Sequence, residues 1–273
     1  MPPRLHLAEL EDQPWLPGLL RDGVRDVLDA LLTRQRFYDG VVPAVRALLE
    51  TTGERTLLDL ASGGGGGTRL VAEQLRAQGL PVTVRFTDRH PNADALARVQ
   101  ALGDPDFQYE PVSVDALDGG GDRPGVRTMA TAAHHFTPDA LRALIGAVVA
   151  RNVPLAFYDL AASPTLRRLP LPVAVLALAI NGVLVALATM AIVPTLRPRR
   201  WSRLFVTYLP PLLPLVVAFD GGISALRSYT ADELLAIARS APGADRYHWD
   251  AGVAGHAVWM TGWPSNDGQE RTA

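Results

Sequence analysis

The chain has 273 residues, enough for one large domain or for one domain that carries an insertion. Its formal net charge of −2 and the lack of a basic stripe argue against nucleic acid as a partner. The absence of Cys excludes disulfides, and the absence of Lys excludes a Walker-type phosphate site and Schiff-base chemistry. The His residues lack a metal-ligand spacing, so we expect no metal.

The N-terminal region, residues 1–50, is expected to form a helical cap. Apolar residues recur at helical spacing over 15–32 and again over 41–49. Phe37 and Tyr38 lie at the joint between the two helices. Tyr38 is a candidate substrate contact, although ordinary packing against a sheet explains it more simply. Residues 1–13 lack an apolar signal core, so a cytoplasmic location is expected.

Residues 51–161 alternate strand and helix, which predicts parallel strands joined by right-handed crossovers. The expected strands cover 56–61, 82–87, 107–114, 126–132 and 153–159, and the expected helices cover 67–78, 91–102 and 138–150. Thr137 and Pro138 are a typical helix start. This pattern predicts an α/β, Rossmann-like fold with helices on both faces of the sheet.

The first of these strands runs directly into five glycines. Leu57 to Leu60 is a short apolar run, Gly63 to Gly67 follow, and an apolar helical stripe begins after Thr68. Glycines let the backbone turn sharply, and a helix N-terminus at a strand end presents unpaired N–H groups. Open α/β sheets bind nucleotides at this position. A flexible linker would be polar on both sides, which this stretch is not.

Three acidic residues accompany the glycine stretch. Asp59 lies inside the first strand, Asp88 ends the second, and Asp115 is expected to end the third. Since parallel strands end at one edge of the sheet, these residues are expected to line one crevice. A carboxylate next to the glycine turn can accept both ribose hydroxyl protons, and one on the next strand can reach an adenine amino group. Each alone could be a helix cap; together they favour a nucleoside ligand.

This order of motifs resembles class I S-adenosylmethionine-dependent methyltransferases. The stretch from Leu58 to Gly65 is similar to that family's first motif, usually Asp-x-Gly-x-Gly-x-Gly, but has Ala61 where Gly is typical. The stretch from Ala132 to Phe136 is similar to the fourth motif, where the methyl group is transferred. The resemblance covers residues 50–160 well. It implies a sheet of seven mostly parallel strands, the last antiparallel, with S-adenosylmethionine as cofactor. The residues it implies for cofactor binding are Asp59, Ala61, Ser62, Gly63, Gly65, Asp88, Arg89, Asp115, Ala116 and Ala132.

Two other functions fit the sequence less well. A nicotinamide oxidoreductase would also have a glycine-rich turn, but a partner site such as Tyr-x-x-x-Lys is impossible without Lys. A membrane-associated binding or scaffold protein could keep the fold without turnover, although the complete acidic set argues against it.

Methyl transfer from a sulfonium mainly requires alignment and exclusion of water, and needs a base only when the nucleophile carries a proton. His134 and His135 are the candidate catalytic bases, because an imidazole titrates near neutral pH. Tyr158 and Asp159, at the end of the fifth strand, are expected to border the same crevice as substrate contacts. Asp159 could equally cap the next segment.

Residues 162–226 form an apolar helical insertion at a position that carries the substrate lid in resembling enzymes. No charged residue occurs from Leu169 to Leu196, and arginines flank this stretch. It is long enough to span a bilayer, but a spanning arrangement would violate the positive-inside tendency. A lid, a peripheral element at the inner face of the membrane, or a homodimer interface through 169–219 remain open. All three imply a small, lipophilic substrate or an apolar partner.

Residues 227–264 complete the core with a helix and a closing strand pair. Thr230 and Glu233 are placed as a capping box, and the strands are expected over 245–250 and 255–262. The polar tail, 265–273, is expected to be disordered.

Overall fold

A computed structural model of the chain describes residues 4, 6–91 and 93–265. The chain forms two compact units. One, called the helical unit here, comprises Met1–Arg36 and Ala162–Ser228; the other, the sheet unit, comprises Phe37–Ala161 and Tyr229–Ala273. The expected cap over 1–50 is therefore divided, because its first helix groups with the insertion and its second belongs to the sheet unit.

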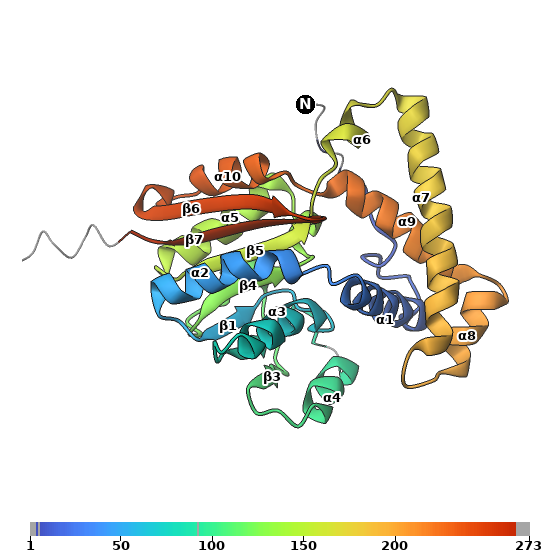
Figure 1. Cartoon of the computed structure of the whole chain (residues 1–273), viewed down its shortest axis with the longest axis horizontal. Coiled ribbons are helices and arrows are strands. Elements are labelled where there is room, and N and C mark those ends of the chain that lie inside the picture. The colour runs from blue at the N-terminus through green and yellow to red at the C-terminus, as the bar shows by residue number, and fades with distance from the viewer. Residues whose placement is uncertain (1–3, 5, 92, 266–273) are drawn as a thin grey trace, which may run out of the picture. The chain divides into compact units, whose positions relative to one another are not determined.

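The sheet unit is built on a mixed sheet with strand order β3-β2-β1-β4-β5-β7-β6 (Figure 1). Strands β1 to β5 pair in parallel, whereas β7 runs antiparallel to both β5 and β6. Seven strands are thus present in the described residues, and the expected Rossmann-like topology is confirmed. Their bounds are Thr56–Asp59 (β1), Thr83–Phe86 (β2), Phe107–Tyr109 (β3), Val126–Ala130 (β4), Leu155–Leu160 (β5), Tyr247–Ala254 (β6) and Ala257–Pro264 (β7).

Helices cover both faces of this sheet, as expected (Figure 1). Helices α2 (Val42–Thr52) and α3 (Gly66–Ala77) pack on one face, and α5 (Pro138–Ala150) and α10 (Ala231–Arg239) on the other; α4 (Ala93–Ala101) lies beside β3. Both predicted helix starts are confirmed: the Thr137 side chain accepts the Ala140 N–H, and Thr230 and Glu233 form a reciprocal capping box. Short 3-10 turns occupy Asp39–Val41, Ala116–Asp118, Ala133–His135 and Ala244–Arg246.

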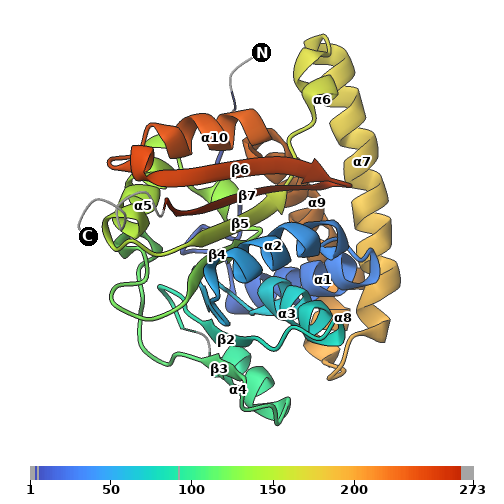
Figure 2. The ribbon, with the colours of Figure 1, turned by 60° about the vertical axis from the view of Figure 1, so that its left-hand side comes forward.

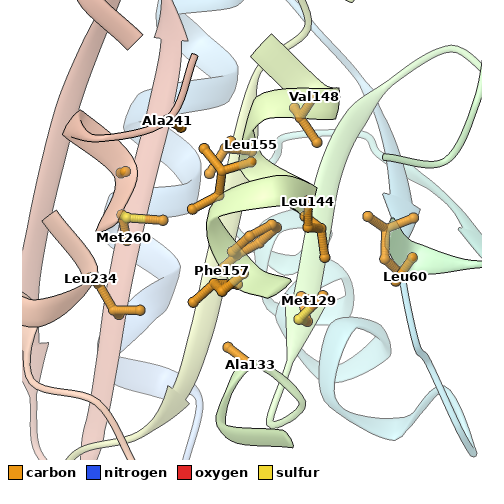
Figure 3. Close-up of a cluster of buried hydrophobic side chains, with 14 of the residues drawn as sticks. Leu60, Met129, Ala133, Leu144, Val148, Leu155, Phe157, Leu234, Ala241 and Met260 are labelled. Carbon is orange, nitrogen blue, oxygen red and sulfur yellow. The ribbon is translucent and has the colours of Figure 1, made fainter. Parts of the chain in front are cut away.

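The main core of the sheet unit lies between the sheet and the α5–α10 face. Phe157 of β5 packs among Met129 of β4, Leu144 of α5 and Leu155, all of them fully buried (Figure 3). Both faces of the central strands are covered, which explains why these strands are continuous apolar runs.

The third strand is shorter than predicted. It ends at Tyr109, whereas a strand over 107–114 was expected. Pro111 has no N–H to donate and cannot continue the ladder. The irregular chain after β3 still follows β2, because the Glu110 N–H donates to the backbone carbonyl of Phe86 and the Val114 N–H donates to the backbone carbonyl of Asp88. Asp115 therefore stays near Asp88 without being a strand end.

The helical unit confirms the predicted helical insertion (Figure 2). Its helices are α1 (Gly18–Arg34), α6 (Pro164–Arg168), α7 (Leu171–Ile192), α8 (Trp201–Tyr208) and α9 (Leu212–Arg227), with a 3-10 turn at Val193–Thr195. Apolar side chains of α1, α8 and α9, together with Ile192 at the end of α7, form its core, which includes Val24, Val206 and Leu213. The expected disordered tail lies outside the described residues from 266 onward.

Candidate active site

The glycine turn connects β1 to α3 in the sheet unit. Ala61, Gly63 and Gly65 adopt positive φ angles of 52°, 52° and 78°, a conformation that favours glycine. A Cβ on Gly65 would lie 3.1 Å from the Phe86 ring, whereas a Cβ on Gly63 would meet nothing within 4 Å. The backbone at Gly63 therefore borders open space, next to the N-terminus of a helix that has no side-chain cap.

Asp88 is bonded to this turn. Its Oδ2 accepts the Gly63 N–H at 2.8 Å, and its Oδ1 accepts the His90 N–H at 2.8 Å. The Tyr109 hydroxyl donates to the Gly63 carbonyl at 3.1 Å, so Gly63 is held from both sides. Each carboxylate oxygen has about two lone pairs. Asp88 can therefore accept two further hydrogen bonds, as a ribose diol requires.

Asp115 lies close to Asp88 but serves also as a cap. Its Oδ1 accepts the Leu117 N–H at 3.0 Å and starts the 3-10 turn, and its Oδ2 lies 3.6 Å from Nε of the exposed Arg89. The predicted neighbourhood of Asp88, Arg89 and Asp115 is thus present, together with the buried Ala116.

Asp59 has a different position from the one expected. Its carboxylate is 1% exposed and accepts hydrogen bonds from the hydroxyls of Thr68 and Thr128. Burial raises its pKa to about 6, although these hydrogen bonds oppose the rise. The expectation that Asp59 lines the crevice with Asp88 and Asp115 is therefore wrong: it lies beneath the turn and ties β1 to α3 and β4.

Tyr158 extends this buried network. Its hydroxyl lies 2.6 Å from that of Thr68, and its ring packs edge-on against Tyr38 with centroids 5.9 Å apart. The Tyr38 hydroxyl lies 3.1 Å from that of Thr131. Both tyrosines are at most 2% exposed, so the expectation that Tyr158 borders the crevice is wrong, and neither tyrosine presents surface to a ligand in this structure.

Ser62 holds the turn against β2. Its hydroxyl donates to the Asp59 carbonyl at 2.9 Å and accepts the Thr87 N–H at 3.1 Å. This side chain therefore fixes the backbone that a cofactor would contact. Ala132, two residues beyond the end of β4, is 7% exposed and leads into the 3-10 turn with the two histidines.

Asp159 and His134 form a buried pair at the ends of β5 and β4. Asp159 Oδ1 lies 2.7 Å from His134 Nδ1, and Oδ2 accepts the His134 backbone N–H at 2.8 Å. Burial raises the pKa of the Asp159 carboxyl, but the charge and hydrogen bonds of His134 outweigh it and the net pKa lies below its ordinary value. An ionised carboxylate only accepts hydrogen bonds, so Nδ1 of His134 carries the proton of this hydrogen bond.

His135 is the neighbour of this pair. It is half-buried, and its ring lies 4.3 Å from the His134 ring between centroids. The Asp159 carboxylate orients the His134 ring through Nδ1. The sequence predicts both residues as site residues, with Asp159 as a substrate contact or a cap; in the structure Asp159 is instead the partner of His134. The pairing itself was missed because the two residues are 25 positions apart and no local sequence signal connects them.

Comparison with known proteins identifies the fold. No family model matches the sequence, and no curated protein matches it. Among solved structures, the plantazolicin methyltransferase BpumL in complex with SAH is similar at a TM-score of 0.55 and 10% identity, over 94% of each chain. Human N-acetylserotonin methyltransferase in complex with SAM has a TM-score of 0.49 at 10% identity, over 91% of this chain and 56% of its own. An O-methyltransferase family protein from Burkholderia thailandensis has a TM-score of 0.45 at 16% identity, over 85% of this chain.

The present chain spans 59% of the Burkholderia protein's length and is therefore shorter than several of the structures it resembles. The match to BpumL covers both proteins almost completely. Together with the strand order, it shows that the chain has the fold of class I S-adenosylmethionine-dependent methyltransferases.

Proposed function

We propose that the protein transfers the methyl group of S-adenosylmethionine to a hydroxyl group of a small, lipophilic acceptor. The observation that carries this proposal is the buried His134–Asp159 pair, in which His134 follows β4 and Asp159 lies near the end of β5, at the same sheet edge as the glycine turn. The fold supports the reaction class, and the apolar composition of residues 169–196 supports a lipophilic acceptor.

The residues present fit the cofactor. Gly63 borders open space and is fixed by Asp88 and Tyr109, so an adenosine group could approach the backbone there. Asp88 would accept the ribose hydroxyl protons, and Asp115 would accept a proton of the adenine amino group. When bound, S-adenosylmethionine supplies a methyl group already activated by the sulfonium.

The remaining chemistry would be done by His134. A hydroxyl nucleophile keeps its proton at neutral pH, so a positioned base accelerates its attack, by a factor on the order of 10² to 10⁴. His134 Nε2 would take this proton, and Asp159 would hold the ring in the required tautomer and stabilise the imidazolium formed. Asp159 is thus a positioning residue, which replaces its predicted role as a substrate contact.

The cofactor site is tested by calorimetric titration with S-adenosylhomocysteine, which needs no acceptor. We expect the wild-type protein to bind it and Asp88→Ala to bind on the order of 100-fold more weakly, because two hydrogen bonds to a charged group are lost. Asp122→Ala is the matched control, since the Asp122 side chain is fully exposed. Unchanged binding by Asp88→Ala would refute the assignment.

The base is tested with methyl-labelled S-adenosylmethionine and a panel of small phenols and alcohols, with lipid extract as a further source of acceptors. His134→Gln and Asp159→Asn should lower transfer about 100-fold or more while S-adenosylhomocysteine affinity stays unchanged. Binding without transfer to any acceptor would favour the scaffold alternative. Transfer that survives His134→Gln would rule out His134 as the base.

A further inference from the structure

The helical unit exposes an extended apolar face. Helix α7 is long and apolar enough to cross a membrane by length and composition, and none of its most apolar window is buried. Leu176, Ile180, Val183 and Leu187 recur every three or four residues along one side and are each 55–60% exposed. The opposite side carries the buried Thr189 and packs against α9. An apolar stripe of this length is unusual on a soluble monomer.

Helices α8 and α9 expose apolar side chains of the same kind. On α8 and its end, Trp201, Phe205 and Leu209 are 86%, 62% and 70% exposed and are spaced four residues apart. On α9, Leu215 and Phe219 are also exposed. An apolar hollow of about 550 Å³ lies between α1 and α8, bordered by Leu19 and Trp201. Exposed Trp and Tyr side chains at an apolar face are typical of the membrane–water interface.

The segment that contains α6, α7, α8 and the first half of α9 carries charges of one sign. From residue 160 to residue 219 the sequence contains no Asp or Glu and six arginines: Arg167, Arg168, Arg197, Arg199, Arg200 and Arg203. Arg203 is internal and pairs with Asp26 at 2.6 Å. Arg168, directly before α7, and Arg197 and Arg199, shortly after it, are exposed. The exposed arginines therefore flank the stripe at both ends of the helix.

This charge pattern distinguishes between two possible partners of the apolar face, a second copy of the chain and an anionic membrane. In a symmetric dimer through α7, the ends of one helix would meet the ends of the other, and arginine would face arginine without an acid from this segment to neutralise it. Phosphate groups of an anionic membrane would instead pair with these arginines. We propose that this face of the helical unit lies in one leaflet of an anionic lipid bilayer.

A peripheral position fits the structure better than a span. A span would place one group of exposed arginines on the far side, whereas a helix of about 33 Å lying in the interface brings both groups to one leaflet. In addition, the second half of α9 carries polar contacts to the N-terminal segment: Asp220 accepts the N–H groups of Leu10 and Glu11, and Arg227 pairs with Asp12 at 3.1 Å. A membrane span through α9 would carry these charged groups into the hydrocarbon core, which is costly.

The test is co-sedimentation of the purified full-length protein with vesicles, either of phosphatidylcholine alone or of phosphatidylcholine with phosphatidylglycerol. We expect binding to the anionic vesicles and release by high salt. Val183→Glu should weaken binding at least tenfold, since it places a charge in the apolar layer. Val253→Glu is the matched control, because Val253 on β6 is equally exposed at 59% and should have no effect. Melting curves confirm that both variants fold.

The arginines are tested separately. Arg197→Glu and Arg199→Glu should each weaken binding to anionic vesicles about fivefold or more. Arg142→Glu, on the exposed surface of α5, should not. Equal effects of Val183→Glu and Val253→Glu, or no preference for anionic lipid, would overturn the proposal. A stable dimer in solution that Val183→Glu dissociates would also overturn it, because a second copy would then occupy the face. These outcomes do not depend on cofactor binding, so this proposal and the proposed function fail separately.

Discussion

The buried carboxyl of Asp59 makes a quantitative prediction about stability and pH. The rise of its pKa from 3.8 to about 6 means that the folded protein binds this proton more tightly than the unfolded chain. Its contribution to the unfolding free energy is therefore fully present below about pH 4 and is lost as the pH rises through about 6. Since the group is completely buried, the loss is on the order of 3 kcal/mol.

Asp59→Asn removes the titration while keeping an oxygen that can accept from Thr68 and Thr128. The amide that replaces the carboxyl makes different hydrogen bonds, and this changes the unfolding free energy by an amount that does not depend on pH. The unfolding free energy of the variant, relative to that of the wild type, should therefore rise by on the order of 3 kcal/mol between about pH 4 and pH 8.

The measurement is urea denaturation of both proteins at the two pH values, followed by circular dichroism and by tryptophan fluorescence. The difference in unfolding free energy between the two proteins is compared at the two pH values, so that the titration of all other groups cancels. Asp122→Asn, at a fully exposed position, is the control and should show no change. A difference between wild type and Asp59→Asn that is the same at both pH values would refute a raised pKa at this position.

Two further variants test the backbone of the sheet unit. Ala61→Gly should stabilise the protein by about 1 kcal/mol, because Ala61 has a φ of 52° where a Cβ is strained; a lower melting temperature would contradict this. Arg127→Met should destabilise it by at least about 3 kcal/mol in urea denaturation. The buried Arg127 guanidinium donates to the carbonyls of Gly119, Gly121 and Gly125, which the variant leaves without these donors. Arg142→Met, at a half-exposed position, should be close to neutral.

The architecture of the sheet unit could be predicted because its signals are local. Apolar runs separated by helical stripes identify parallel strands and crossovers, and caps such as Thr137 and the Thr230–Glu233 box mark helix starts directly in the sequence. The end of β3 was missed because apolar residues resume at Val112 and Val114 after Phe107 and Tyr109, although their phase shifts at Pro111, which also removes a ladder donor.

The site was predicted less completely, because the direction of a side chain at a strand end depends on one residue of register. Asp88 lies two residues beyond β2 and reaches the glycine turn, whereas Asp59 is the last residue of β1 and points beneath that turn, towards α3. A shift of one position would exchange these environments. The pattern of acids alone therefore indicates a nucleoside ligand without showing which acid would touch it.

The uncharged stretch from 169 to 196 shows where sequence reasoning reaches its limit. A helix that is apolar on all sides is either buried in a core or placed in a membrane, and its composition is the same in both cases. The structure buries only the side towards α9 and leaves Leu176 and Val183 exposed. The arginines at both ends are the basis of our proposal of a lipid surface, since an exposed apolar stripe bounded by positive charge matches the chemistry of an anionic lipid surface better than that of its own copy.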